Sequence, residues 1–334
     1  MSSSPDRGAR STPLYLQLQL QIYFVPVNAL VRLVVLLRRL FGPDKHAPRR
    51  YLSILLPFDR RLSTYLHSPA PGPQNPSSPS STGKTRRKPV HINFHGGGFC
   101  LPLHGTDARF CALVAREAGC YVLDASYRRA PSHPFPAAYD DARAVLAWVR
   151  EDTLGLFDTS RITVGGFSAG GNLALALAAT AEPGVQGMIA FYPPVDLTGP
   201  YSRKPAPART KLDRNSGMVI SPSDEERSRK AYLLALSASE QALPDPRYSP
   251  LFASPDKFPG GGRTMILTCE YDYLAAEGEA LARALEEAGR EPVAIRVEGK
   301  GHSWDGMCVE GSEGARVRDE MWLRAAEVVR HAQA

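Results

Sequence analysis

Short apolar runs alternate with longer amphipathic segments over most of the chain after Pro89. The runs have the length and the β-branched and aromatic content of strands, and each stands about one helix length from the next. This spacing predicts right-handed strand–helix–strand crossovers and a mostly parallel central sheet flanked by helices, the α/β class. Functional groups of such sheets gather at the carboxyl ends of the strands. The predicted strands are VHINF at 90–94, YVLDAS at 121–126, ITVGGF at 162–167, GMIAFY at 187–192, TMILTC at 264–269 and VAIRV at 293–297.

The segment 14–41, LYLQLQLQIYFVPVNALVRLVVLLRRLF, is the most apolar part of the chain. The pattern divides at Pro26: leucine and isoleucine alternate with glutamine before it, and residues 29–40 have the pattern of a helix after it. No stretch of 18 residues lacks a polar group, and an A-x-A cleavage motif is absent near its end. Three interpretations stay open: a cap helix of a soluble protein, contact with a membrane surface through residues 14–41, and a membrane span.

Two further segments interrupt the alternating pattern. Residues 68–88 are rich in proline and serine and end in a basic cluster, which predicts an exposed, mobile loop. Residues 197–247 are irregular but contain SPSDEERSRKAYLLAL, which predicts a capped helix. Ser221 is its expected N-cap, Pro222 stands in the first turn, and Asp224 follows three residues after the cap.

Charge is distributed unevenly along the 334 residues. Residues 1–90 hold 14 Lys and Arg against 3 Asp and Glu, and the remainder holds 26 against 31, so +11 and −5 give the net +6. A nucleic-acid surface would place basic residues among stacking aromatics, but Arg32, Arg38 and Arg39 stand among leucines and valines, so we expect no nucleic-acid partner.

The five cysteines are odd in number and lack close CxxC spacing, which predicts neither a disulfide framework nor a zinc site. We therefore expect an intracellular, cytoplasmic protein, with peripheral membrane association as the alternative that segment 14–41 leaves open.

The stretch GGFSAGGN at 165–172 contains the pentapeptide G-x-S-x-G around Ser168. A β-branched run precedes it and the helix former NLALALAATA follows, so Ser168 falls on a strand-to-helix turn. Such a turn exposes the hydroxyl, its glycines remove Cβ clashes, and the helix N-terminus supplies amide donors. The context favours a nucleophilic serine over a flexible glycine-rich loop.

A nucleophilic serine needs a base, and in this architecture the acid and then the histidine follow it along the chain. Only His302 and His331 lie far downstream, and His331 belongs to the tail HAQA. His302 follows the last predicted strand, where the base is expected. Asp272, directly after TMILTC, is favoured as the acid over Glu270, which is too close to the strand end, and Glu277, which belongs to the next helix.

Amide donors for an oxyanion are predicted where the strand HINF runs into a glycine triplet. The backbone amides of Gly97, Gly98 and Ala169 are the expected donors, supported by His95 and Gly96. A phosphate loop is excluded because no Lys-Ser/Thr pair follows the glycines. His95 precedes the serine, so we expect it to brace this loop rather than to act as the base.

Together these motifs closely resemble the hormone-sensitive-lipase-like branch of the α/β-hydrolase family over roughly residues 50–332. The resemblance implies a carboxylic-ester hydrolase with Ser168 acylated, His302 transferring the proton and Asp272 orienting it. It implies no metal or organic cofactor. The motifs are HGGGF at 95, YRRAPSHPFPAAYDD at 127, GFSAGGNLAL at 166, YPPVDL at 192, YSPLFA at 248, EYDYLAAEGEAL at 270 and GHSW at 301.

The resemblance also implies a division of the chain into N-terminal cap helices over residues 1–50 and a catalytic α/β-hydrolase domain over residues 51–334. The cap is completed by an insertion at about 197–247, so the expected fold is an α/β-hydrolase with a helical cap. Phe99 and Phe167 are candidates for the substrate pocket. Phe167 departs from the family, since many relatives have Asp or Thr there. We interpret Arg128 as a buried ion-pair partner of Asp140 or Asp141 rather than a substrate contact.

The chemistry leaves the leaving group and acceptor open. A small-molecule ester of short to medium acyl chain is the expected substrate, and amidase, deacetylase, lactonase and acyltransferase activities use the same residues. A non-catalytic small-molecule receptor is a further alternative, because receptors of this family have lost the histidine. The presence of both Ser168 and His302 weighs against it.

Overall fold

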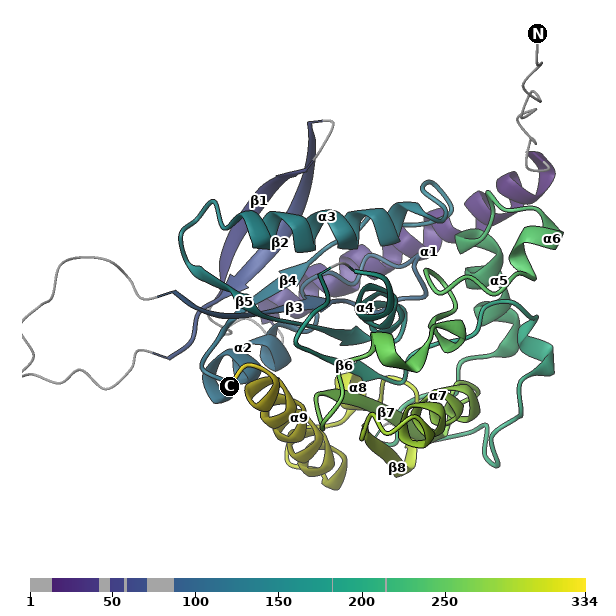
Figure 1. Ribbon diagram of the computed structural model, residues 1–334. Helices are drawn as coiled ribbons and strands as arrows, with labels where there is room; N and C mark the ends of the chain where they lie inside the picture. The colour runs from purple at the N-terminus through teal and green to yellow at the C-terminus, as the bar shows by residue number, and fades with distance from the viewer. Residues whose placement is uncertain (1–13, 42–48, 57–58, 71–86, 182, 214) are drawn as a thin grey trace, which may run out of the picture.

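The computed structural model describes residues 14–41, 49–56, 59–70, 87–181, 183–213 and 215–334. Most of the loop predicted at 68–88 lies outside the described residues, as does the N-terminal part of the predicted cap. The described chain is built around one eight-stranded sheet of order β1-β2-β4-β3-β5-β6-β7-β8 (Figure 1).

The sheet is parallel from β4 to β8 and antiparallel at one edge. The six predicted strands are confirmed as β3 to β8, although β5 begins five residues earlier than 162. The sequence analysis missed β1 and β2, an antiparallel pair that extends the sheet beyond β4. The strands are β1 Arg50–Leu56, β2 Arg60–His67, β3 Lys88–Phe94, β4 Tyr121–Ala125, β5 Phe157–Phe167, β6 Gly187–Phe191, β7 Thr264–Tyr271 and β8 Val293–Gly301.

Helices cover both faces of the sheet and one end of it (Figure 1). One hydrophobic core joins α3, α4 and α7 to one face, and a second joins α2 and α9 to the other. The central helix α4 is buried along almost its whole length, which suits its alanine- and leucine-rich sequence. The helices are α1 Leu14–Phe41, α2 Ala108–Glu117, α3 Ala137–Glu151, α4 Ala169–Thr180, α5 Pro222–Tyr232, α6 Ala238–Gln241, α7 Ala275–Glu287, α8 Trp304–Met307 and α9 Glu313–Ala332.

The predicted division at Pro26 is wrong, because α1 is one continuous helix with Pro26 inside it. A proline within a helix removes one backbone hydrogen bond and costs about 3 kcal/mol. Leu20 and Phe24 on one side of Pro26 and Val35 on the other are buried against the rest of the protein. This packing holds the helix together through the proline, and the alternation of leucine and glutamine wraps around a helix instead of forming a strand.

The insertion after β6 carries α5 and α6, which lie near the N-terminal half of α1 (Figure 1). Ser221 is confirmed as the N-cap residue of α5. Its hydroxyl accepts a hydrogen bond from the amide of Asp224, and Pro222 is the first helical residue. The Tyr23 hydroxyl of α1 donates to the Asp224 carboxylate over 3.0 Å, so the two cap segments contact one another.

Candidate active site

Ser168 stands on the predicted turn between β5 and α4, at the carboxyl end of the strand. Its backbone has φ +51° and ψ −118°, a strained conformation for a residue with a side chain. A Cβ on Gly166 would lie 2.4 Å from the Phe94 carbonyl oxygen, and one on Gly170 would lie 1.9 Å from the same atom. Both glycines are therefore required for the turn to pack against β3, and the turn is rigid rather than flexible.

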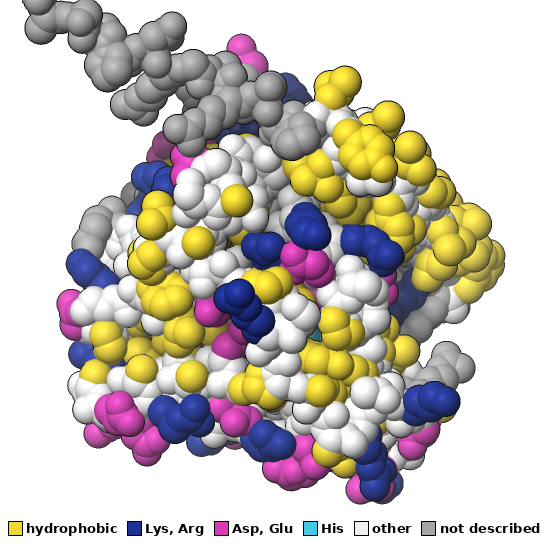
Figure 2. Space-filling view, turned by 90° about the vertical axis from the view of Figure 1, so that its right-hand side faces the viewer, with side chains coloured by type: hydrophobic (Ala, Val, Ile, Leu, Met, Phe, Trp, Pro, Cys, Tyr) yellow, Lys and Arg dark blue, Asp and Glu magenta, His cyan; other side chains and the backbone are white. Residues whose placement is uncertain are grey.

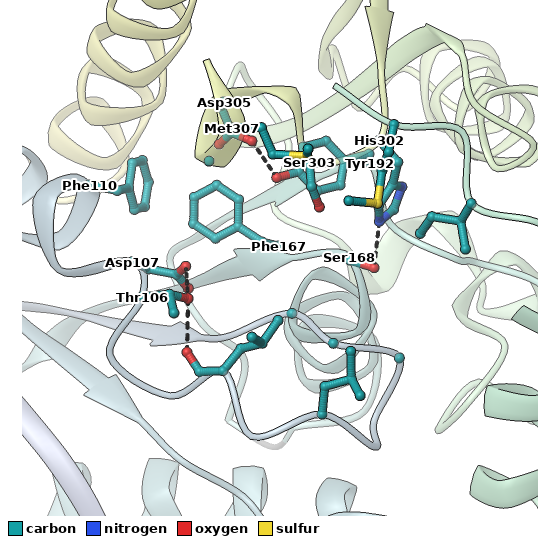
Figure 3. Close-up of a pocket in the computed structure, with 18 of the residues that line it drawn as sticks. Thr106, Asp107, Phe110, Phe167, Ser168, Tyr192, His302, Ser303, Asp305 and Met307 are labelled. Carbon is teal, nitrogen blue, oxygen red and sulfur yellow. Dashed lines mark hydrogen bonds between the residues drawn. The ribbon is translucent and has the colours of Figure 1, made fainter. Parts of the chain in front are cut away.

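His302 lies between Ser168 and Asp272 in a continuous line of hydrogen bonds. Its Nε2 is 2.9 Å from the Ser168 Oγ, and its Nδ1 is 2.7 Å from Oδ2 of Asp272. The other carboxylate oxygen of Asp272 accepts the amide of Leu274 over 3.1 Å, which fixes the carboxylate. All three side chains are buried, with 7%, 2% and 7% exposed for the serine, histidine and aspartate. Figure 3 shows the serine and histidine facing one another at the cavity wall.

The two other acids considered for this position are engaged elsewhere. Glu270 accepts the amide of Gly299 over 2.7 Å. Glu277 accepts the amide of Val195 and pairs with Lys204. Among the three acids weighed from the sequence, Asp272 is the one that contacts His302.

The loop that carries His302 is held by the insertion after β6. The backbone of His302 forms an isolated antiparallel bridge with Met218. The Met218 amide donates to the His302 carbonyl oxygen over 3.1 Å, and the His302 amide donates to the Met218 carbonyl oxygen over 2.7 Å. A Cβ on Gly301 would lie 2.5 Å from the Met218 carbonyl oxygen, so a glycine before the histidine permits this close approach. The insertion therefore positions the histidine as well as covering it.

Opposing effects act on the pKa of His302. Burial lowers it, but the charge of Asp272 and the hydrogen bond to that carboxylate raise it, and the charge of Glu225 adds to them. The net result is a pKa above the ordinary value for histidine. The imidazole is thus arranged to accept a proton from Ser168 and to be stabilised once charged.

The glycine loop after β3 bends beside the serine turn. Gly97 and Gly98 have φ of +107° and +57°, which glycine adopts without strain. The amides of Gly97 and Gly98 donate no hydrogen bond within the described part of the chain. Ala169 is the first residue of α4, whose amide has no acceptor inside the helix. Three amide donors near the serine are thus left for a bound group.

His95 packs beneath this loop. Its Nδ1 is 2.7 Å from the Gly96 carbonyl oxygen, and its ring stacks on Tyr127 with centroids 4.3 Å apart. The Tyr127 hydroxyl donates to the His95 carbonyl oxygen over 2.8 Å. Burial lowers the pKa of His95 well below its ordinary range, which keeps the ring neutral. These contacts match a bracing role.

A cavity of about 950 Å³ opens beside Ser168 and His302. Phe167 lies in its wall, stacked on Phe191 with centroids 4.6 Å apart and edge-on to Phe110 at 4.9 Å. Figure 3 shows Phe167 between Phe110 and Ser168. Phe99, which we expected in the pocket, does not line this cavity. The residue is 3% exposed, and its ring stacks on Tyr232 with centroids 3.8 Å apart.

The cavity also contains residues that the sequence analysis missed. Glu225 and Ser228 of α5 line it, and Ser228 Oγ lies 2.9 Å from the place of a Cβ on Gly98. Burial raises the pKa of Glu225 above its usual range. Both residues lie on α5 in the insertion after β6. The sequence predicts this helix, but it does not predict which side of the helix lines the cavity.

Asp305, which also lines the cavity, supports the ring beside His302. Its carboxylate accepts the Tyr192 hydroxyl over 2.6 Å and the Trp322 Nε1 over 3.1 Å. The Tyr192 ring lies 4.6 Å from the His302 ring. Tyr192 opens the motif YPPVDL, and His302 lies in the motif GHSW. Neither motif predicts that these two rings are in contact.

The predicted ion pair of Arg128 is confirmed with Asp141 as the partner, although only the aspartate is buried and the arginine side chain is 32% exposed. The buried Asp141 carboxylate accepts the Arg128 amide over 2.9 Å and its Nε over 2.9 Å. Neither residue lines the cavity.

Among the described residues, one group could hold a metal ion, namely His67, Cys111 and Asp124. Their ligand atoms lie within 4.8 Å of one another, and all three side chains are buried. None of them lines the cavity beside Ser168.

Comparisons of sequence agree with this geometry. A family model described as an alpha/beta hydrolase fold matches residues 91–305. The carboxylic ester hydrolase LipN of Mycobacterium tuberculosis is 33% identical over 241 residues, which cover 68% of this chain and 60% of LipN. The arylesterase of Saccharolobus solfataricus is 29% identical over 228 residues, 64% of this chain and 68% of the relative. The chain thus matches about three fifths to two thirds of these relatives' own lengths.

Solved structures share the whole fold. A hyperthermophilic esterase from the archaeon Pyrobaculum calidifontis has a TM-score of 0.71 at 26% identity, with 100% of each chain covered. A thermophilic carboxylesterase cloned from a metagenomic library has a TM-score of 0.72 at 27% identity, covering 92% of this chain and 97% of that one. The match over residues 91–305 and the expected sheet, serine turn and glycine loop lead to one conclusion: the chain belongs to the α/β-hydrolase family, in its hormone-sensitive-lipase-like branch.

Proposed function

We propose that the protein is a serine hydrolase that cleaves carboxylic esters through an acyl-enzyme on Ser168. The observation that carries the proposal is the buried line of hydrogen bonds from Ser168 through His302 to Asp272 at the edge of a cavity. The names of the relatives and of the solved neighbours, which are esterases, support the same reaction class.

In the first half of the reaction, the Ser168 Oγ attacks the ester carbonyl carbon while its proton passes to His302 Nε2. Negative charge develops on the carbonyl oxygen, and the amides of Gly97, Gly98 and Ala169 stabilise it. The tetrahedral intermediate collapses when the ester C–O bond breaks, and His302 gives the proton to the departing alcohol. The acyl group stays on Ser168.

In the second half, water takes the place of the alcohol. His302 accepts a proton from the water as its oxygen attacks the acyl carbon, and a second tetrahedral intermediate forms in the same group of amides. Its collapse returns the proton to Ser168 and releases the carboxylic acid. Asp272 keeps the proton on Nδ1 throughout and stabilises the imidazolium. The residues named here supply every proton transfer.

We expect the substrates to be esters with acyl chains of short to medium length. The cavity volume of about 950 Å³ falls at the upper end of small-molecule pockets. The wall beside the serine is aromatic, built from Phe167, Phe110 and Trp322. Bulky aromatic side chains limit the length of a chain that lies against them, whereas the Asp or Thr of many relatives at position 167 would leave more room.

Hydrolysis of p-nitrophenyl acetate and butyrate tests the proposal. The wild-type protein should hydrolyse these esters and be labelled by a fluorophosphonate, and Ser168→Ala should abolish both hydrolysis and labelling. An unchanged rate in the alanine variant refutes the assignment of the nucleophile. Absence of labelling in the wild type supports a receptor instead, and a panel of amides, lactones and competing alcohols identifies the acceptor and leaving group.

A further inference from the structure

Helix α1 has two unlike faces. One contains Leu20, Phe24 and Val35, which are spaced at helical intervals and buried against the protein. The opposite face carries Leu18, Ile22, Val25, Leu33 and Leu40, each of which is more than half exposed. Side chains at intervals of three and four residues share a helix face, so these residues form an apolar stripe about 33 Å long from Leu18 to Leu40.

The exposure of this stripe is large for apolar side chains. Leu18 is 54% exposed, Ile22 66%, Leu33 52% and Leu40 55%. Figure 2 shows a broad hydrophobic patch at its upper right. Further exposed apolar residues of α1 widen the stripe: Leu14, Tyr15, Leu30, Val34, Leu36, Leu37 and Phe41. Contiguous apolar surface of this extent marks an interaction site rather than ordinary surface.

The charges of the segment point to the partner. Residues 14–41 contain no Asp or Glu and three arginines, and residues 1–90 carry a net charge of +11. A broad apolar face on a segment whose charged residues are all arginines matches a bilayer that contains anionic lipids. A second copy of this chain would bring like charges together across the contact.

The helix is attached to the protein along its other face, which excludes a span in this arrangement. Residues 14–38 are long and apolar enough to cross a bilayer, with a mean hydropathy of 1.9, and 17% of the most apolar stretch is buried. However, the Tyr23 hydroxyl binds Asp224, and the Arg38 guanidinium donates to the Gly306 carbonyl oxygen over 3.3 Å. A helix held in this way can lie in the interface with its free face down.

The same helix borders the cavity. Tyr23, Phe24 and Val27 line it together with Arg38. A membrane against the free face would therefore stand one helix diameter from the cavity, about 10 Å. Apolar esters that partition into a bilayer would be concentrated close to the serine.

We propose that the outward face of α1, defined by Leu18, Ile22, Val25, Leu33 and Leu40, docks the protein on the surface of an anionic membrane. The proposal concerns binding and does not depend on the reaction at Ser168.

Flotation of the full chain with vesicles tests it. Vesicles of phosphatidylcholine and phosphatidylserine in equal parts should carry the wild-type protein, with weaker binding at high salt and on phosphatidylcholine alone. The variant L18Q/I22Q/L33Q/L40Q should lose vesicle binding by about tenfold or more, because glutamine removes the apolar surface at four outward positions. Arg32→Gln should weaken binding to the anionic vesicles alone.

The matched control replaces three exposed apolar residues elsewhere. L243Q/F252Q/L323Q removes side chains that are 58%, 45% and 43% exposed, and it should bind vesicles as the wild type does. Circular dichroism and hydrolysis of p-nitrophenyl acetate without lipid report whether each variant is folded, since the four outward residues do not line the cavity. A folded quadruple variant that still floats overturns the proposal. The proposal is also overturned if the wild-type protein does not bind vesicles. In that case, a dimeric mass in solution that the quadruple substitution reduces to a monomer would identify a second copy of the chain as the partner.

Discussion

Replacement of Asp272 by asparagine tests the charge that supports His302. The carboxylate lies 2.7 Å from Nδ1 and is 7% exposed, so solvent screens the pair poorly. With an effective dielectric constant of about 20 and charge centres about 4 Å apart, the carboxylate stabilises the imidazolium by about 4 kcal/mol. That amount is a factor of about 10³ in rate. Asparagine also offers an N–H to Nδ1, which moves the histidine proton to Nε2 and costs about a further tenfold.

We therefore expect kcat on p-nitrophenyl butyrate to fall by about 10³ to 10⁴ in Asp272→Asn, with KM little changed. Steady-state kinetics of folded protein measure this. Glu270→Gln is the matched control. It also removes one negative charge, at a position two residues before Asp272, but the Glu270 carboxylate accepts the amide of Gly299 and does not contact His302. It should keep kcat within about twofold. A kcat above a tenth of wild type in Asp272→Asn, or an equal loss in Glu270→Gln, would refute the assignment of the acid.

Two further predictions follow from the same geometry. Gly170→Ala should lower the free energy of unfolding in urea by about 3 kcal/mol or more, because its Cβ would lie 1.9 Å from the Phe94 carbonyl oxygen. Gly171→Ala should cost less, since its nearest contact is 3.1 Å, and equal losses would contradict this account of the turn. Glu225→Gln should move the acid limb of the kcat/KM pH profile to lower pH. Catalysis needs neutral His302, the charge of Glu225 raises its pKa, and removal of that charge leaves more histidine neutral in acid. The exposed control Glu287→Gln should leave the limb in place, and a shift to higher pH in Glu225→Gln would overturn the argument.

The insertion after β6 contacts the active-site residues in several ways. Met218 bonds the backbone of His302, and Ser228 approaches the glycine loop. Glu225 adds its charge to the histidine's surroundings. Because this insertion contacts the backbone of His302, the glycine loop and the cavity, we expect a substitution in it to affect both substrate binding and catalysis.

Local patterns in the sequence determined much of the protein. The strand GMIAFY and its counterparts could be read directly because a buried parallel strand is apolar on both faces. The cap at Ser221 follows from a hydrogen bond that spans three residues. The line from Ser168 to Asp272 was predictable because chain order and strand ends restrict which residues can meet.

Tertiary structure decided what local pattern leaves open. Phe99 lies in the core, because its ring stacks on Tyr232, a residue 133 positions later in the chain (232 − 99). Helix α1 passed through Pro26 because packing on both sides outweighs the cost of one proline. The approach of Glu225 to His302 joins segments 77 residues apart in the chain (302 − 225). The energy that places such pairs comes from burial against surfaces formed only after the sheet is assembled, so no window of the sequence contains it.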